Sequence, residues 1–77
     1  MFTVNLLVEN LYLPLGDPAR VIVKSHFYKT RKAADICFNR YVVMLQSHNL
    51  SGRVLLLEDD GRPVIDYIRE HGNSSYV

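Results

Sequence analysis

Apolar and polar residues alternate in the first part of the chain and predict two β-strands. From Phe2 to Val8 one face is apolar throughout, while the other carries mostly polar residues. A period of two, with aromatic and β-branched residues, is typical of a strand with one buried face. Residues 20–29 alternate again, and their predicted buried face carries Val21, Val23 and Phe27. The face predicted to be exposed carries Arg20, Ile22, Lys24, His26 and Tyr28.

Between Arg31 and Asn49 the apolar residues recur with the period of a helix. Thr30 is the expected N-cap, because its hydroxyl can accept a hydrogen bond from a backbone N–H that the first turn leaves free. Gly52 is the expected left-handed residue at the end of the helix. The side predicted to face the core carries Ala34, Cys37, Phe38, Tyr41, Met44 and Leu45.

The last third of the chain predicts a hairpin. Residues 53–58 form a third predicted strand, and Asp59-Asp60-Gly61 is a tight-turn sequence in which Gly61 supplies a positive φ. Residues 62–68 fit either an edge strand that contains Pro63 or a short helix with Pro63 in its first turn. The hairpin is the preferred interpretation. Residues 73–77 are predicted to be a frayed tail.

The segment between the first two predicted strands combines turn-forming residues with large apolar ones. Pro14, Gly16, Asp17 and Pro18 favour a loop. The same segment contains Leu11, Tyr12, Leu13 and Leu15. Two interpretations stay open, because these side chains could cap one end of the core or form an apolar surface for a partner.

These elements predict a β-β-α-β-β order and an α+β fold, a two-layer sandwich with one helix packed on a mainly antiparallel sheet. The 77 residues have room for a single domain, residues 1–77. A chain of this length buries only about 60% of the surface that its unfolded form exposes, so its stability is marginal. One face of the sheet is expected to stay open or to meet a partner.

Composition narrows the class of protein. An apolar fraction of 48% is too high for a disordered chain. The single cysteine, Cys37, excludes an intramolecular disulfide and fits a buried apolar position in a reducing compartment. No apolar run approaches the roughly 20 residues of a membrane span, and the N-terminus lacks the basic region of a signal peptide. We therefore expect a cytoplasmic protein with no membrane partner.

No arrangement of residues predicts catalysis. His26, His48 and His71 lack the spacing of metal ligands, and Cys37 lies on the predicted core side of the helix, where a thiol is inert. Glu58-Asp59-Asp60 lacks the alternating oxygen ligands of a calcium loop. The chain contains no serine-elbow or phosphate-loop motif. We expect a protein that is not an enzyme, with no cofactor, no metal ion and no small-molecule substrate.

The helix side opposite the predicted core suggests a protein-binding surface. Ile36 and Val43 lie seven residues apart, with Asn39 between them and Arg40 beside them. This spacing resembles a short helix-pairing seam, although isolated apolar side chains are also common on protein surfaces. Together with the Leu11–Leu15 segment it predicts a protein-binding module, whose partner is another protein or a second copy in a homodimer.

Uneven charge suggests an alternative function. The net charge is only +1, but residues 20–40 contain six basic residues against one acidic residue, Asp35. Cations with an interleaved aromatic residue suit the phosphates of a nucleic acid. The candidate nucleic-acid-binding residues are Arg20, Lys24, His26, Tyr28, Lys29, Arg31 and Lys32.

Two stretches carry a resemblance to known proteins. The run Tyr28-Lys29-Thr30-Arg31-Lys32-Ala33-Ala34 leads into the predicted helix, and residues 52–65 contain the third predicted strand, the predicted turn and the start of the segment that follows it. This pattern resembles small β-β-α-β-β proteins that are common in bacteriophage genomes. The resemblance implies a virus-encoded protein in the host cytoplasm that binds, and inhibits, a host protein.

Overall fold

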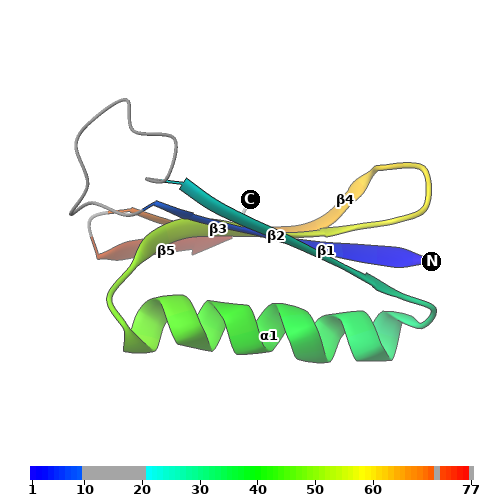
Figure 1. The fold of residues 1–77 in the computed structure, drawn as a ribbon, viewed down its shortest axis with the longest axis horizontal. Helices are drawn as coiled ribbons and strands as arrows, with labels where there is room; N and C mark the ends of the chain where they lie inside the picture. The colour runs from blue at the N-terminus through cyan, green and yellow to red at the C-terminus, as the bar shows by residue number, and fades with distance from the viewer. Residues whose placement is uncertain (10–20, 71, 77) are drawn as a thin grey trace.

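The protein is described by a computed structural model that covers residues 1–9, 21–70 and 72–76. One helix packs on one face of a five-stranded antiparallel sheet (Figure 1), which confirms the predicted α+β two-layer fold. In chain order the elements are β1 (Phe2–Glu9), β2 (Val21–Tyr28), α1 (Arg31–Ser47), β3 (Ser51–Leu57), β4 (Pro63–Glu70) and β5 (Asn73–Tyr76). The predicted Leu11–Leu15 surface and Arg20 lie outside the described residues.

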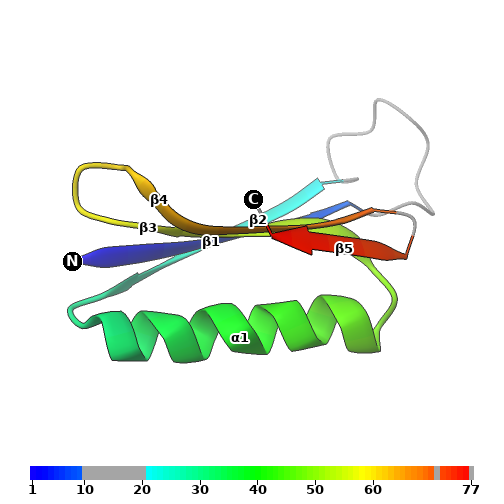
Figure 2. The ribbon, with the colours of Figure 1, turned by 180° about the vertical axis from the view of Figure 1, so that it is seen from behind.

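The sheet has the strand order β2-β1-β3-β4-β5, so β2 and β5 are its edges (Figures 1 and 2). The first strand, β1, pairs with β2 on one side and with β3 on the other. Its register with β2 is regular from Phe2 opposite Tyr28 to Glu9 opposite Val21. Residues directly opposite each other in an antiparallel pair point to the same face of the sheet.

This register shows that the predicted faces of β2 are inverted. His26 lies opposite Val4 and Lys24 lies opposite Leu6, and both of these β1 residues are buried under the helix. Val23 and Phe27 point to the uncovered face and are 62% and 67% exposed. The inversion is possible because β2 carries apolar residues on both faces and lies at a sheet edge, where burial does not select one face strongly.

The core lies between the inner side of α1 and the middle of the sheet. The buried helix residues are Ala34, Phe38, Val42 and Leu45. The buried apolar sheet residues are Val4, Leu6, Val8, Val54, Leu56 and Tyr67. The predicted core side of the helix lacked Val42, and three of its members, Cys37, Tyr41 and Met44, are only half-buried at the margin of the core. The helix is thus turned toward Val42 relative to the prediction.

The two ends of α1 are fixed differently. At the start, the Thr30 hydroxyl accepts a hydrogen bond from the Ala33 backbone N–H at 3.2 Å, which confirms the predicted N-cap. At the end, the left-handed residue is Asn49, with φ of 51°, and not Gly52. Arg69 of β4 holds this end, because its guanidinium donates to the carbonyl oxygens of Leu45 and Leu50 and to the Asn49 side chain.

The C-terminal part of the chain is all strand. The preferred hairpin is confirmed, with Gly61 at a positive φ of 82° between β3 and β4. The predicted frayed tail is wrong, because residues 73–76 form β5 and pair with Tyr67–Glu70 (Figure 2). The Tyr67 hydroxyl and the Ser74 hydroxyl share a hydrogen bond of 2.6 Å, which helps to hold this polar segment. Because β5 is short, the Pro63 end of β4 still lies at a sheet edge.

Gly52 has a packing role that generates a prediction. A Cβ atom at this position would lie 2.4 Å from the carbonyl oxygen of Leu7 on the neighbouring strand. The strands would have to move apart, so we expect Gly52→Ala to lower the free energy of unfolding by about 2 kcal/mol or more.

Gly61→Ala is the matched control for this prediction. Gly61, unlike Gly52, has a positive φ, but nothing lies within 4 Å of its added Cβ atom. The control is therefore expected to lower the free energy of unfolding by only about 1 kcal/mol. Urea denaturation of both variants measures the difference, and equal losses would contradict the close approach of β1 and β3.

Candidate binding surfaces

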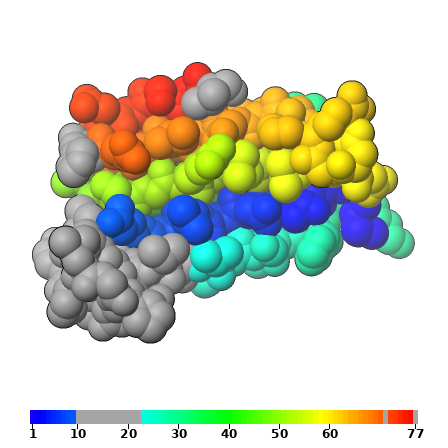
Figure 3. Space-filling model, turned by 90° about the horizontal axis from the view of Figure 1, so that it is seen from above, coloured from blue at the N-terminus to red at the C-terminus, as the bar shows by residue number. Residues whose placement is uncertain are grey.

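The sheet face opposite α1 forms the first candidate surface, which we call the open face. Leu7, Val23 and Phe27 are 41%, 62% and 67% exposed on it. Leu7 lies directly opposite Val23, so the apolar side chains of β1 and β2 adjoin one another. Half-buried side chains of β3 and β4 continue the face across the sheet (Figure 3), namely Leu55, Leu57 and Ile68.

A neutralised ion pair lies among these apolar residues. The Arg53 guanidinium donates to both carboxylate oxygens of Asp66, at 2.8 and 2.5 Å. The Asp66 side chain is only 10% exposed, and Arg53 is 45% exposed. This hydrogen bonding raises the pKa of Arg53, and the charge of Asp66 adds to the effect. The pair leaves no uncompensated charge at this point of the open face.

A shallow hollow of about 250 Å³ lies between the strands of the open face. Its floor includes a cross-strand hydrogen bond from the Ser25 hydroxyl to the Asn5 amide oxygen at 2.7 Å. The other lining residues come from β1, β2 and β3 and include Leu7, Val23, Arg53 and Leu55. The hollow therefore combines apolar walls with a few oriented polar groups.

The outer side of α1 carries the predicted helix surface. Ile36 and Val43 are 49% and 56% exposed, and Asn39 and Arg40 are exposed between them. These positions agree with the predicted side of the helix. Ile36 and Val43 are a smaller apolar surface than the open face of the sheet, and the Leu11–Leu15 segment that was predicted to act with them lies outside the described residues.

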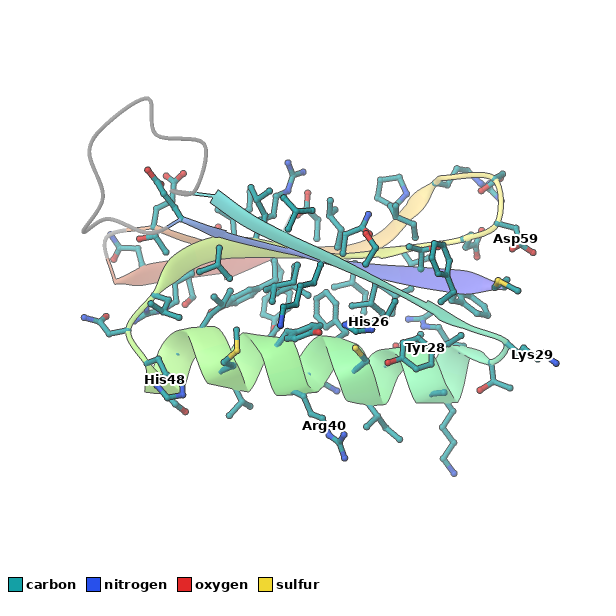
Figure 4. The ribbon with its side chains drawn as sticks, viewed as in Figure 1. His26, Tyr28, Lys29, Arg40, His48 and Asp59 are labelled. Carbon is teal, nitrogen blue, oxygen red and sulfur yellow. The ribbon has the colours of Figure 1, made fainter. Side chains whose placement is uncertain are left out.

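A groove runs between the edge strand β2 and α1. It has a volume of about 390 Å³ and is lined by His26, Tyr28, Ala33, Ile36, Cys37, Arg40 and Tyr41. Figure 4 shows His26 between the strand and the helix, Tyr28 beside the first turns of the helix, and Arg40 projecting from the helix away from the sheet. His26 Nε2 is hydrogen-bonded to the Tyr41 hydroxyl, and the two rings stack with centroids 5.7 Å apart.

The phenols in this groove resist ionisation. A hydrogen bond with the Cys37 side chain, and then partial burial, raise the pKa of Tyr28. Burial is the larger cause that raises the pKa of Tyr41, and Cys37 adds to it. Cys37 is therefore a half-buried part of the groove wall, and not the fully buried core residue that the sequence predicted.

The predicted nucleic-acid-binding residues do not share one surface. Lys24, His26 and Tyr28 point to the helix side of β2 and not to the open face. Arg31 donates to Asp35 one helical turn away at 2.9 Å, so its charge is partly compensated. Lys29 follows β2 and is exposed, and Lys32 is exposed on α1. Of these residues, His26 and Tyr28 line the groove together with Arg40 of α1, and Lys24 points to the same side of β2, two residues from His26.

Sequence reasoning missed the groove because its lining comes from two separate elements. The sequence analysis assigned the helical residues Tyr41 and Cys37 to the core, and it assigned His26 and Tyr28 to the exposed face of the strand.

In the described part of the chain, no three His, Cys, Asp or Glu side chains are grouped so that they could hold a metal ion. None of the described helices is long and apolar enough to cross a membrane.

The raised pKa values predict a loss of stability in alkali. A phenol whose pKa is higher in the folded than in the unfolded chain stabilises the fold below its unfolded pKa of about 10. That contribution is lost as the pH rises through the folded pKa. We expect the free energy of unfolding to fall with pH above about 10, and to fall less steeply in Tyr41→Phe, which has one such phenol fewer.

Urea titrations over a series of alkaline pH values measure these slopes. Tyr76→Phe is the matched control, because Tyr76 is 63% exposed on the edge strand β5. This control removes one phenol hydroxyl from an exposed position in place of the groove. A slope in Tyr41→Phe equal to that of the parent chain would contradict the burial of the Tyr41 hydroxyl in the folded protein.

The described residues thus form three candidate binding surfaces: the open face, the outer side of α1 and the groove. They differ in chemistry, since the open face is apolar with a neutralised ion pair and the groove is aromatic with cations at its margin. Comparison of the chain with family models, with curated proteins and with solved structures gives no match in any of the three.

Proposed function

We propose that the chain is a non-catalytic protein-binding module that acts through the open face of its sheet. The observation that carries this proposal is that Leu7, Val23 and Phe27 are all exposed on that face, with Leu7 directly opposite Val23 and Phe27 further along the same strand. Apolar side chains gathered in this way on a small domain mark interaction surfaces, whereas scattered ones do not. The outer side of α1, with Ile36 and Val43, is a smaller surface of the same kind.

The partner that fits the open face best is a second copy of this chain. Strands lie about 4.8 Å apart and rise about 3.3 Å per residue, so the face covers roughly 500 to 600 Å² before side-chain relief is counted. A standard interface buries about 800 Å² of accessible surface per partner, which is close to what this face can supply. Two such faces can pack about 10 Å apart, as in a β-sandwich.

Charge also favours self-association at this face. Two identical surfaces with a net charge would repel each other across a two-fold axis. At the centre of the face, Arg53 and Asp66 neutralise one another instead, in a bidentate pair that needs no counterion from the partner, while Glu70 lies at the end of β4. Dimerisation would also add stability to a domain of marginal size, by mass action.

The resemblance to small bacteriophage proteins suggests a setting for such a module, in which it binds and inhibits a host protein.

Nucleic-acid binding, the alternative function, is favoured by one observation. Within the described residues, Lys24, Lys29 and Arg40 have no ion-pair partner; Arg40 lines the groove, Lys24 points to its side of β2, and Lys29 follows the end of that strand. Nucleic-acid binding is therefore the second candidate function, and its surface would be the groove and not the open face.

Polar substitution on the open face tests the dimer. We expect the parent chain to have about twice its chain mass of 8.9 kDa in light scattering behind size exclusion, at both low and high salt. Val23→Asp combined with Phe27→Asp is expected to restore the monomer mass, because charges would be buried in the apolar interface. Circular dichroism should stay native, since both side chains are exposed in the single chain.

Ile36→Asp combined with Val43→Asp is the matched control. It introduces the same charges at exposed apolar positions on the outer side of α1. This variant is expected to keep the dimer mass. If this variant is a monomer and the open-face variant is still a dimer, the dimer interface lies on the outer side of α1 and not on the open face. A parent chain that stays monomeric at about 100 µM would contradict a functional dimer.

A further inference from the structure

In the described part of the chain, one side of the edge strand β2 is unpaired along the whole length of the strand. It pairs with β1 through all eight of its residues, in regular register. Among the described residues no strand pairs with its other side. In an edge strand, half of the backbone N–H and C=O groups point away from the sheet and are free to pair with another chain.

The opposite edge of the sheet is less suited to accept a strand. There β5 has only four residues, and it leaves the Pro63 end of β4 uncovered. A proline has no N–H to donate and is a common means of blocking an edge. Neither a proline nor a bulge interrupts β2. The two edges of one sheet thus differ, and only β2 presents a long regular template.

The groove lies directly beside this unpaired edge. A strand added to β2 would alternate its side chains between the open face and the helix side, as β2 itself does. Its helix-side residues would enter the groove next to Lys24, His26 and Tyr28, which are spaced two residues apart on β2. The groove floor offers apolar and aromatic contacts from Ile36, Cys37 and Tyr41.

Charge decides which strand fits. Lys24 and Lys29 on the strand side and Arg40 on the helix side are exposed, and the structure shows no ion pair for any of them within its described residues. Among the described residues that line the groove none is acidic, and Asp35 on α1 is bonded to Arg31. Opposite charges in cross-strand positions stabilise a strand pair, and like charges destabilise it.

From this geometry we propose that β2 and the groove bind an extended acidic segment of another protein by β-strand addition. Acidic residues of the segment pair with Lys24, Lys29 and Arg40, and its backbone pairs with the free side of β2. A second copy is disfavoured at this edge, because its own β2 would bring its Lys24 toward cations of the same kind. A nucleic acid could meet the cations but offers no peptide backbone to the edge.

A synthetic peptide tests the proposal with the full chain. The probe is a fluorescein-labelled peptide of alternating glutamate and valine, as long as β2. We expect it to bind in fluorescence anisotropy and to slow hydrogen exchange at the β2 amides, while a peptide of alternating lysine and valine does not bind. The double variant Lys24→Glu and Arg40→Glu is expected to weaken binding about tenfold or more.

Two matched controls separate backbone pairing from charge alone. Lys32→Glu makes the same charge change at an exposed helix residue that does not line the groove, and it should leave binding unchanged. Two acidic probes carry N-methyl groups, one on every glutamate nitrogen and the other on every valine nitrogen. Alternate residues of a strand point their N–H groups to opposite sides, so only one of the two sets faces β2. Methylation of that set removes the N–H groups that pair with β2 and must abolish binding.

Several outcomes would overturn strand addition at this edge. They are no binding of the acidic peptide at millimolar concentration, equal binding of the lysine peptide, or binding of both methylated probes. Binding of a single-stranded oligothymidylate in place of the peptide, with loss in the Lys24→Glu and Arg40→Glu variant, would assign the groove to nucleic acid. Because the groove and the open face use different atoms, each of these results is independent of the dimer mass.

Discussion

A single helix has to cover a five-stranded sheet, and the rest of the structure depends on this constraint. A helix is about 10 Å across, and strands lie about 4.8 Å apart, so one helix can cover the width of two or three strands. In this protein α1 packs chiefly on β1 and β3, the two strands at the middle of the buried face. One whole face of the sheet is left uncovered, and both sheet edges extend beyond the helix. The candidate surfaces are direct consequences of that geometry.

The space between the helix and the sheet is filled differently on the two sides of the helix. On the β4 side, long polar side chains fill the space, with Tyr67 fully buried and Arg69 only 9% exposed. The Arg69 charge is placed where carbonyl oxygens of the helix end point toward it, which favours a cation. Its Nε has no hydrogen-bond partner among the described residues, so burying this N–H group lowers the stability of the fold. On the β2 side, His26 and Tyr41 meet between the strand and the helix, and the groove remains beside them.

Periodicity predicted the elements better than it predicted their orientation. The helix, its N-cap at Thr30 and the hairpin at Gly61 follow from local rules, because each depends on neighbouring residues. Local rules do not determine which face of β2 points toward the helix, since Phe27 on one face and Tyr28 on the other are equally suited to a core. Tertiary pairing with β1 decides between them. The polar strand β5 was also missed, because its pairing depends on Tyr67 in the preceding strand.

The inversion of β2 changes what its residues can do. Had Lys24 pointed to the open face with His26 and Tyr28, a cation and apolar residues would have shared one surface, and a dimer there would bury charge at a high cost. With Phe27 and Val23 on that face instead, the apolar and the cationic chemistry of one strand are separated by the sheet. Association through the open face should depend little on salt, whereas binding at the groove should weaken as salt screens it. The two proposed contacts can therefore be occupied together, because one uses the side chains of a face and the other the backbone of an edge.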